Sequence, residues 1–400
     1  MIRYIILILC CLAFYSCEKN NNTTTEEKKS SEEITKSDTI NPTRENNTTR
    51  VKLKSHSKFT LNDFYKDNTE LDSLTELVFN SMSDNDRIAQ MIITSAGNNG
   101  KSDDQVLNLI KNKKVGGVVF LGGSKDRFTN LIKSFKETAE KVKSLPLLFS
   151  TDAEPSLINM KISGLKQFPA TNTIKDIGTC SKTTNDLSKT LNEIGFNQNY
   201  APVCDNNVNR EIIGDRSFGN DPEVIEKLST VFIQESQKNN ILATAKHFPG
   251  HGFVKGDSHK SLVYIDGQLK ELDVYKALIE HSPLISIMVG HIAVRNNKEY
   301  DTDGYPATLC RKIVTDLLKR EMKFKGIVIT DAMNMGALST FPSPSFKAVD
   351  AGCDMILMPT DENQLISTIL TKLRTDDKFK SQVYESIKKI IKVKLCLGLM

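Results

Sequence analysis

Residues 326–334 read "GIVITDAMN", an apolar run that ends abruptly at Asp331. Its β-branched and aliphatic residues favour a short strand that is buried on both faces. Seven similar runs occur elsewhere in the chain: "MIITSAG" near 91, "VGGVVFLGG" from 115, "LPLLFSTDAE" from 145, "FNQNYAPVCD" from 196, "ILATAKHFPG" from 241, "SIMVGHIAV" from 286 and "DMILMPTD" from 354. The sequence therefore contains eight candidate strands.

Helical periodicity separates these runs. Segments such as "RFTNLIKSFKETAEKV" from 127 and "NDLSKTLNEI" from 185 are amphipathic, and "SDNDRIAQMI" opens with Ser83 or Asp84 as a helix cap. Buried strands that alternate with such helices form parallel sheets with both faces covered. Because there are eight units and no dinucleotide-binding glycine pattern, we expect an α/β fold, a (β/α)8 barrel of the TIM type.

Polar residues gather where the candidate strands end. The carboxyl-terminal rim of such a barrel is where its enzymes keep their active sites. A single Asp after a strand is more often a helix cap, but several equivalent strand ends are polar here. These positions are Asp152, Asp205, His247, His291, Asp331 and Asp361.

The composition is that of an ordinary globular protein. With 39% hydrophobic residues, 26% charged residues and a formal net charge of +4, the 400 residues show no basic surplus that would indicate nucleic acid binding. Tryptophan is absent, which excludes sugar stacking on that side chain. The cysteines beyond the N-terminal region are dispersed and form no CxxC pair, so we expect buried free thiols.

The first residues, "MIRYIILILCCLAFYSCEKN", indicate a secretory signal peptide over residues 1–17. Its end resembles a bacterial lipobox, which implies that Cys17 becomes the lipidated N-terminus of a protein in the bacterial cell envelope, either periplasmic or surface-exposed. The alternative is a plain signal with an incidental cysteine. Residues 18–54 are polar and should form a flexible tether, which leaves residues 55–400 for the barrel.

Residues 245–262, "AKHFPGHGFVKGDSHKSL", hold an unusual density of titratable groups. Lys246 and His247 finish a strand and can present adjacent donors to hydroxyl or carbonyl groups. A metal site formed by His247, His251 and His259 is the alternative. It is disfavoured because "PG" at 249–250 forbids the helix that a spacing of four would need.

In the same loop, "GDSH" separates Asp257 from His259 by one residue. A carboxylate that bonds one ring nitrogen fixes the tautomer and raises the basicity of the imidazole, which suits general acid/base chemistry. The alternative is a solvated loop histidine. Asp331, on a rigid strand end, is the first candidate for a nucleophile, with capping of the following helix as its alternative.

Several motifs together resemble glycoside hydrolase family 3, in particular its bacterial β-N-acetylglucosaminidase branch. They are "KHFPGHG", "DSH", "ATL" at 307–309, "GIVITDAMNMGAL" at 326–338, "AGCDMILMP" at 351–359, "GDRSFGNDP" at 214–222 and "APVCDNN" at 201–207. The similarity extends from about residue 70 to the C-terminus.

The resemblance implies a single catalytic domain that works as a retaining exo-glycosidase, without cofactor or metal. Asp331 would attack the anomeric carbon, and His259, paired with Asp257, would protonate the leaving oxygen and then activate water. Asp152, Arg216, Lys246 and His247 would bind the terminal N-acetylglucosamine. Expected substrates are cell-wall muropeptides or chitin-type oligosaccharides, met at a membrane through the lipid anchor.

Two other functions stay open. A neutral imidazole does not repel phosphate, so the same glycosyl-enzyme could serve a phosphorylase. An inactive glycan-binding surface lipoprotein is the other possibility, because "DAEPSLINMKISG" at 152–164 departs from the family pattern. Pro155-Ser156 replace two glycines and Met160 replaces a usual arginine, for which we expect the neighbouring Lys161 to substitute in part. We also expect His259 to reach Asp331 only when substrate closes its loop.

Overall fold

The computed structural model describes residues 58–400, so the predicted signal, Cys17 and the tether lie outside the described residues. Each of the eight predicted runs contains one strand of a single parallel sheet. The strands are β1 (Ile92–Ala96), β2 (Gly117–Phe120), β4 (Leu148–Thr151), β6 (Gln198–Asn199), β7 (Leu242–Phe248), β9 (Ser286–Val289), β11 (Ile327–Thr330) and β12 (Ile356–Leu357).

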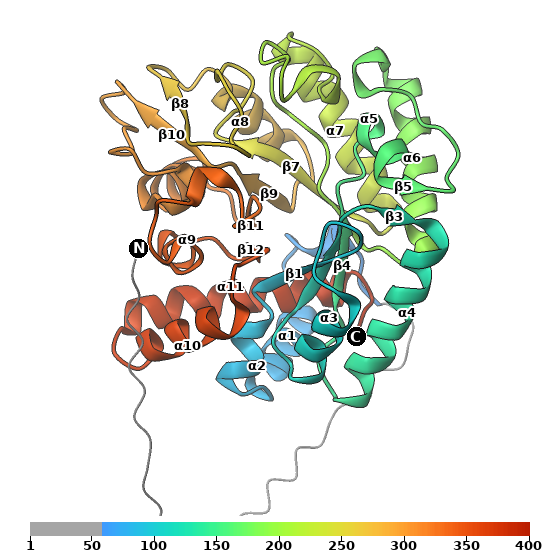
Figure 1. The fold of residues 1–400 in the computed structure, drawn as a ribbon, viewed down its shortest axis with the longest axis vertical. Coiled ribbons are helices and arrows are strands. Elements are labelled where there is room, and N and C mark those ends of the chain that lie inside the picture. Colours follow the sequence, from blue (N-terminus) through green and yellow to red (C-terminus); the bar gives the residue numbers. More distant parts are fainter. Residues whose placement is uncertain (1–57) are drawn as a thin grey trace, which may run out of the picture. The chain divides into compact units, whose positions relative to one another are not determined.

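The strands follow one another around the sheet in the order in which they occur in the chain (Figure 1). β1 pairs with both β2 and β12, and β11 pairs with β9, always in parallel. An isolated parallel bridge between Ile329 and Met355 joins the two ends of the sheet and nearly closes it. The predicted (β/α)8 barrel is therefore confirmed.

Helices cover the outside of the barrel (Figure 1). The predicted cap of one of them is Ser83, whose side chain accepts a hydrogen bond from the Asp86 amide. The α-helices are α1 (Thr69–Asn80), α2 (Asp84–Ala89), α3 (Asp103–Lys111), α4 (Lys125–Lys141), α5 (Pro155–Lys161), α6 (Ile177–Ile194), α7 (Pro222–Lys238), α8 (Leu272–His281), α9 (Pro344–Ala351), α10 (Glu362–Leu373) and α11 (Asp377–Cys396), and a π-helical segment spans Lys312–Glu321.

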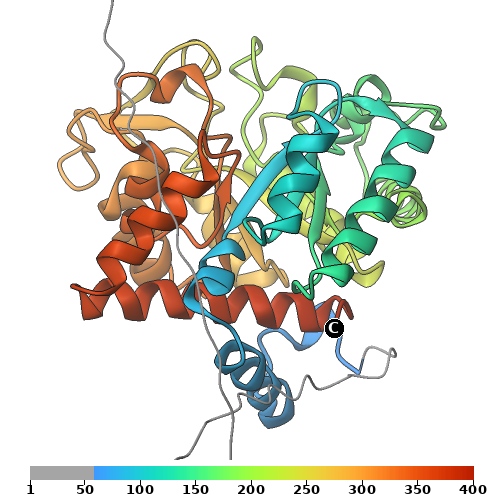
Figure 2. The same cartoon turned by 60° about the horizontal axis from the view of Figure 1, so that its bottom comes forward.

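The last helix, α11, crosses the end of the barrel at which the strands begin (Figure 2). The buried Lys394 ammonium donates to the side chain of Gln90 and to the carbonyl oxygen of Gly116, which precede β1 and β2. Lys389 donates to the carbonyl oxygen of Gly326, just before β11. Because this end is covered, the carboxyl ends of the strands form the open rim.

One predicted strand is interrupted. The run "SIMVGHIAV" is divided at Gly290 and His291 into β9 and β10 (Ile292–Arg295). β10 leaves the barrel and pairs with β8 (Val263–Asp266), in the segment that follows β7. The hydrophobic pattern alone could not reveal this break, since both halves are buried and only the pairing partner changes. A second small pair joins β3 (Gly123–Ser124) to β5 (Ile162–Ser163).

The cysteines of the described chain are free thiols, as predicted. Four of them are buried, and Cys310 is half-buried. Burial raises the pKa of Cys180, Cys204 and Cys353 to about 12, so these thiols stay protonated and unreactive at neutral pH. We therefore expect no thiol chemistry at these three positions.

Candidate active site

A network of charged side chains, buried at Lys246 and Glu154 and half-buried at the other positions, occupies the rim beyond β4 and β7. The Lys246 ammonium lies 2.7 Å from Asp152 Oδ1 and 2.6 Å from Glu154 Oε1. Arg216 donates a hydrogen bond to each oxygen of Glu154, one from Nε and one from Nη2, both at 2.8 Å. Lys161 completes the network by bonding Asp152 Oδ2 at 2.8 Å. Bidentate and charge-assisted bonds of this kind fix donors in a rigid array.

The pKa shifts of Asp152, Glu154 and Lys246 all favour the charged forms of these groups. Burial alone would raise the pKa of Glu154, but Arg216 and Lys246 lower it to about 2. Lys161 and Lys246 likewise hold the pKa of Asp152 below its ordinary value against the effect of burial. The pKa of Lys246 is raised, because its two carboxylate partners outweigh burial. Three cations face two carboxylates, which leaves one positive charge in excess.

The segment that departs from the family pattern still joins this network. Met160 is 77% exposed, whereas its neighbour Lys161 bonds Asp152. Ser156 donates to the Asp215 carbonyl oxygen at 2.6 Å and accepts from the Thr171 amide at 2.7 Å. The unusual Pro155-Ser156 pair therefore ties the start of α5 to the segment that carries Arg216.

His247 is oriented by Asp205, which is completely buried after β6. The Asp205 carboxylate lies 2.7 Å from His247 Nδ1 and accepts the backbone amide of His251 at 2.7 Å. Since a carboxylate can only accept, Nδ1 of His247 carries a proton. His247 was predicted as a donor beside Lys246. That role in binding the sugar stays a prediction.

Asp331 follows β11 directly and is half-buried. Its backbone amide donates to the Val289 carbonyl oxygen, and its Oδ1 accepts the Ala332 amide at 2.8 Å. Burial raises the pKa of this carboxyl, but the neighbouring His247 and His291 and the Ala332 amide bring it below the ordinary value. The group is thus an ionised carboxylate at neutral pH, as a nucleophile must be.

The predicted pair of Asp257 and His259 is formed. Asp257 Oδ1 lies 2.8 Å from His259 Nδ1 and also accepts the His259 backbone amide. The imidazole is 62% exposed, so its Nε2 side is open to solvent. Burial raises the pKa of Asp257, but the bonds from His259 lower it below the ordinary value, so the carboxylate stays charged beside the ring.

The loop that carries this pair docks onto the loop that follows Asp331. The Gly336 amide donates to the His259 carbonyl oxygen at 3.0 Å, and the Ala337 amide to that of Ser258 at 3.3 Å. A Cβ atom at Gly336 would lie only 2.7 Å from the His259 oxygen, so any side chain there would force the loops apart. The acid/base pair and the nucleophile are thus linked through main-chain contacts. Closure of the loop on substrate stays a prediction.

A residue that sequence reasoning missed holds the start of the same loop. Glu271 is buried and accepts the amides of Asn206 at 2.6 Å and Gly252 at 3.0 Å. Burial and the nearby Asp205 raise the pKa of Glu271 to about 8. In the sequence Glu271 sits in "LKELD", which looks like a helix surface, and no local signal could have found it. Glu154 could be predicted more easily, because it lies only two residues after Asp152 at the end of a strand.

Nothing in the described part of the chain supports the alternative of a metal site formed by His247, His251 and His259. His251 Nε2 lies 3.0 Å from Ser258 Oγ, and its pKa is lowered by burial and by His247, so it acts as a loop anchor. Within residues 58–400, no group of three or more His, Cys, Asp or Glu side chains is placed to hold a metal ion.

Asp361, which also follows a predicted strand, caps a helix. Its side chain accepts the Gln364 amide at the start of α10.

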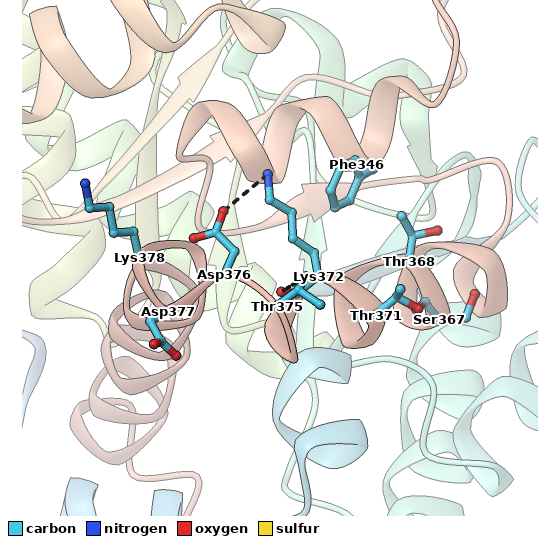
Figure 3. A pocket seen from close by; sticks show the side chains of 9 residues that line it. All are labelled: Phe346, Ser367, Thr368, Thr371, Lys372, Thr375, Asp376, Asp377 and Lys378. Atoms are coloured by element: carbon cyan, nitrogen blue, oxygen red, sulfur yellow. Dashed lines mark hydrogen bonds and ion pairs between the residues drawn. The ribbon is translucent and has the colours of Figure 1, made fainter.

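A groove elsewhere on the barrel contains none of the predicted residues (Figure 3). It lies where α10 meets α11, and Phe346 of α9 forms one wall. The hydroxyls of Thr368 and Thr371 bond helix carbonyls, and Lys372 pairs with Asp350 and Asp376. The side chains of Thr368, Thr371 and Lys372 therefore already have partners within the fold.

Residues 84–393 match the model of the glycosyl hydrolase family 3 N-terminal domain. The chain belongs to this family. Beta-hexosaminidase A of Pseudoalteromonas piscicida is 28% identical over 327 residues, which cover 72% of this chain and 55% of that protein. The beta-hexosaminidase of Tolumonas auensis is 27% identical over 277 residues, 64% of this chain and 78% of that protein.

Solved structures of the family agree with the fold. A family 3 β-N-acetylglucosaminidase from Paenibacillus superposes with a TM-score of 0.72 at 25% identity, over 80% of this chain and 63% of that one. A β-N-acetylhexosaminidase from Beutenbergia cavernae gives a TM-score of 0.69 at 22% identity, over 77% and 97% of the two chains. This family 3 chain thus spans little more than half of the length of some relatives that it matches.

Proposed function

We propose that this family 3 chain is a retaining exo-glycosidase that releases terminal β-linked N-acetylglucosamine from cell-wall or chitin-type oligosaccharides. The observation that carries the proposal is one rim that holds an ionised Asp331, an Asp257-His259 pair on a docked loop, and a rigid array of cationic donors. The names of the matched relatives support the choice of sugar.

In the first step an oxygen of the Asp331 carboxylate attacks the anomeric carbon and the bond to the leaving oxygen breaks. His259 gives the Nε2 proton to that oxygen, while the Asp257 carboxylate stabilises the ring through Nδ1. In the second step His259 takes a proton from water, whose oxygen attacks the same carbon and releases Asp331. Two displacements on one carbon restore the β configuration. Arg216, Lys246 and His247 bind the hydroxyl groups and the amide of the sugar. The Asp152 carboxylate accepts hydrogen bonds from the sugar hydroxyl groups.

Phosphorolysis remains the second candidate, because of the charges around the acid/base pair. The Lys260 ammonium lies 3.6 Å from Asp257 Oδ2, on the side of that carboxylate away from the imidazole. An incoming phosphate would therefore meet an imidazole, and a carboxylate whose charge Lys260 offsets, rather than a free negative charge. Reactions in phosphate and in phosphate-free buffer separate the two activities by their products, a sugar phosphate or the free sugar.

The function is tested with two substrates that differ only in leaving group, a nitrophenyl and an alkyl β-N-acetylglucosaminide. We expect His259→Ala to lose about 10-fold in kcat/KM on the nitrophenyl substrate and about 1,000-fold on the alkyl one, because only the poor leaving group needs a proton. His281→Ala is the matched control, since His281 is a similarly exposed histidine that ends α8. Equal losses on both substrates, or an inactive wild-type chain in either buffer, would refute the proposal.

We further propose a lipid anchor at Cys17, in the cell envelope, on the basis of the N-terminal sequence. In the part of the chain that the structure covers, no helix is long and apolar enough to cross a membrane. We expect the full chain expressed in a bacterium to partition into detergent, and the Cys17→Ser chain to stay in the aqueous phase. Equal partitioning of the two chains would contradict the anchor.

A further inference from the structure

His291 is a fully buried histidine at the rim to which the reaction above assigns no role. It lies between β9 and β10, where the predicted strand is interrupted. Its Nε2 atom is 3.0 Å from the carbonyl oxygen of Ala332, and its Nδ1 atom is 2.7 Å from Thr308 Oγ1. Ala332 in turn donates its amide to Oδ1 of Asp331. Hydrogen bonds therefore link Thr308 and His291 to Ala332, and the backbone of Ala332 in turn bonds the carboxylate of Asp331.

The direction of these bonds follows from the groups themselves. A carbonyl oxygen can only accept, so Nε2 of His291 must carry the proton. Burial lowers the pKa of His291 below its ordinary value, with Asp331 opposing and His247 and His259 assisting this shift. The ring is therefore neutral at neutral pH, and Nδ1 accepts the hydroxyl proton of Thr308. Both polar atoms of the imidazole are satisfied in one tautomer.

The segment around Asp331 is otherwise held by main-chain bonds. The Asp331 amide donates to the Val289 carbonyl oxygen, and the Met333 amide to that of Leu357 at 2.9 Å. The Ala332–Met333 peptide is thus fixed at its amide end by β12, and at its carbonyl end by His291 together with the Met335 amide, which donates to the same oxygen at 3.1 Å. In residues 58–400, no other side chain holds the Ala332 carbonyl oxygen.

We propose that His291, oriented by Thr308, is a positioning residue for the nucleophile: it fixes Ala332 so that the Ala332 amide holds Oδ1 of Asp331 and Oδ2 is left to attack. This inference rests on the proposed function, in which Asp331 is the nucleophile. A donor that holds one carboxylate oxygen sets the direction of the other, and small errors in that direction are costly for a displacement reaction.

The test compares His291→Phe, which keeps a ring of similar size, with His291→Gln, which restores an N–H donor. We expect His291→Phe to lower kcat about 30-fold on the nitrophenyl substrate while KM changes less than about 3-fold, since the loss concerns the reacting group rather than sugar binding. We expect His291→Gln to recover most of that loss. The acidic limb of the profile of kcat/KM against pH should also move to higher pH, because a misaligned Ala332 amide no longer favours the charged form of Asp331.

Thr308→Val and Thr308→Ser provide the second pair, because the valine keeps the shape of the threonine and loses only the hydroxyl group. We expect Thr308→Val to lower kcat about 5-fold, and Thr308→Ser to retain more activity than Thr308→Val. If His291→Phe does not fold, this pair decides the matter. An unchanged kcat and acidic limb in the His291 variants, or equal activity of the two Thr308 variants, would overturn the inference. An inactive wild-type chain would refute the proposed function instead, so the two failures are distinguishable.

Discussion

Replacing Asp331 by asparagine is expected to lower kcat on the nitrophenyl β-N-acetylglucosaminide by about 10,000-fold, the largest effect of any single change in this chain. The amide has nearly the shape of the carboxylate, and its oxygen can still accept the Ala332 amide. The fold should therefore persist. The variant lacks the negatively charged carboxylate oxygen that forms the covalent bond to the anomeric carbon.

The matched control is Asp361→Asn. Asp361 also stands just beyond a strand, but its oxygen only caps α10, and asparagine caps helices equally well. We expect the control to keep its turnover and its thermal midpoint. More than about a tenth of the wild-type turnover in Asp331→Asn, measured with the same substrate, would remove Asp331 from the role of nucleophile.

Azide distinguishes the nucleophile from the acid/base residue. In Asp331→Ala the missing side chain leaves space on its face of the sugar, so azide attacks there and yields a glycosyl azide of inverted configuration. In His259→Ala the aspartyl ester still forms, and azide attacks from the opposite face with overall retention. The two stereochemical outcomes, read by NMR, assign the residues independently of rate. The same anomer from both variants would contradict the assignment.

The sequence was sufficient to predict the barrel because its signal is repetitive. Eight buried runs such as "GIVITDAMN", each followed by an amphipathic segment, leave few topologies open. The break at His291 could not be predicted, since "SIMVGHIAV" is apolar on both sides of it and only pairing with β8, more than twenty residues earlier in the chain, bends β10 away.

The candidate site likewise has a part that the sequence predicts and a part that it does not. A barrel brings the carboxyl ends of its strands to one rim, so Asp152, Lys246 and Asp331 could be grouped from their positions alone. Which carboxylate pairs with which cation depends on the packing of loops, and the sequence does not encode it locally. Glu271 is an extreme example, because it contacts an amide 65 residues away.

The second large effect is expected for Glu154→Gln. Glu154 is 1% exposed and bonds both Arg216 and Lys246. A glutamine presents an N–H₂ group to one of these cations and removes the charge that both of them share. Breaking one partner out of a buried ionic network costs about 3–5 kcal/mol of unfolding free energy. We also expect kcat/KM to fall about 100-fold, since Arg216 and Lys246 lose their fixed positions in the proposed sugar subsite.

The effect on stability should depend on pH in a defined direction. The pKa of Glu154 is about 2 in the folded chain, against an ordinary value of 4.5. A carboxyl with a lowered pKa stabilises the fold above its ordinary pKa, and this contribution is lost as the pH falls toward the lowered value. The difference in thermal midpoint between wild type and Glu154→Gln should therefore be constant above about pH 5 and shrink from about pH 4.5 downward.

Glu193→Gln is the matched control for this measurement, because Glu193 forms an ion pair with Lys125 at 2.8 Å on the surface. Its removal should leave the thermal midpoint and kcat/KM unchanged, since exposed pairs contribute little. Glu154→Asp keeps the charge but shortens the reach, and we expect it to fall between wild type and Glu154→Gln in both quantities. A Glu154→Gln chain that matches the Glu193→Gln chain at pH 7 would mean that Arg216 and Lys246 hold their positions without Glu154, and that the charged array is not built around this carboxylate.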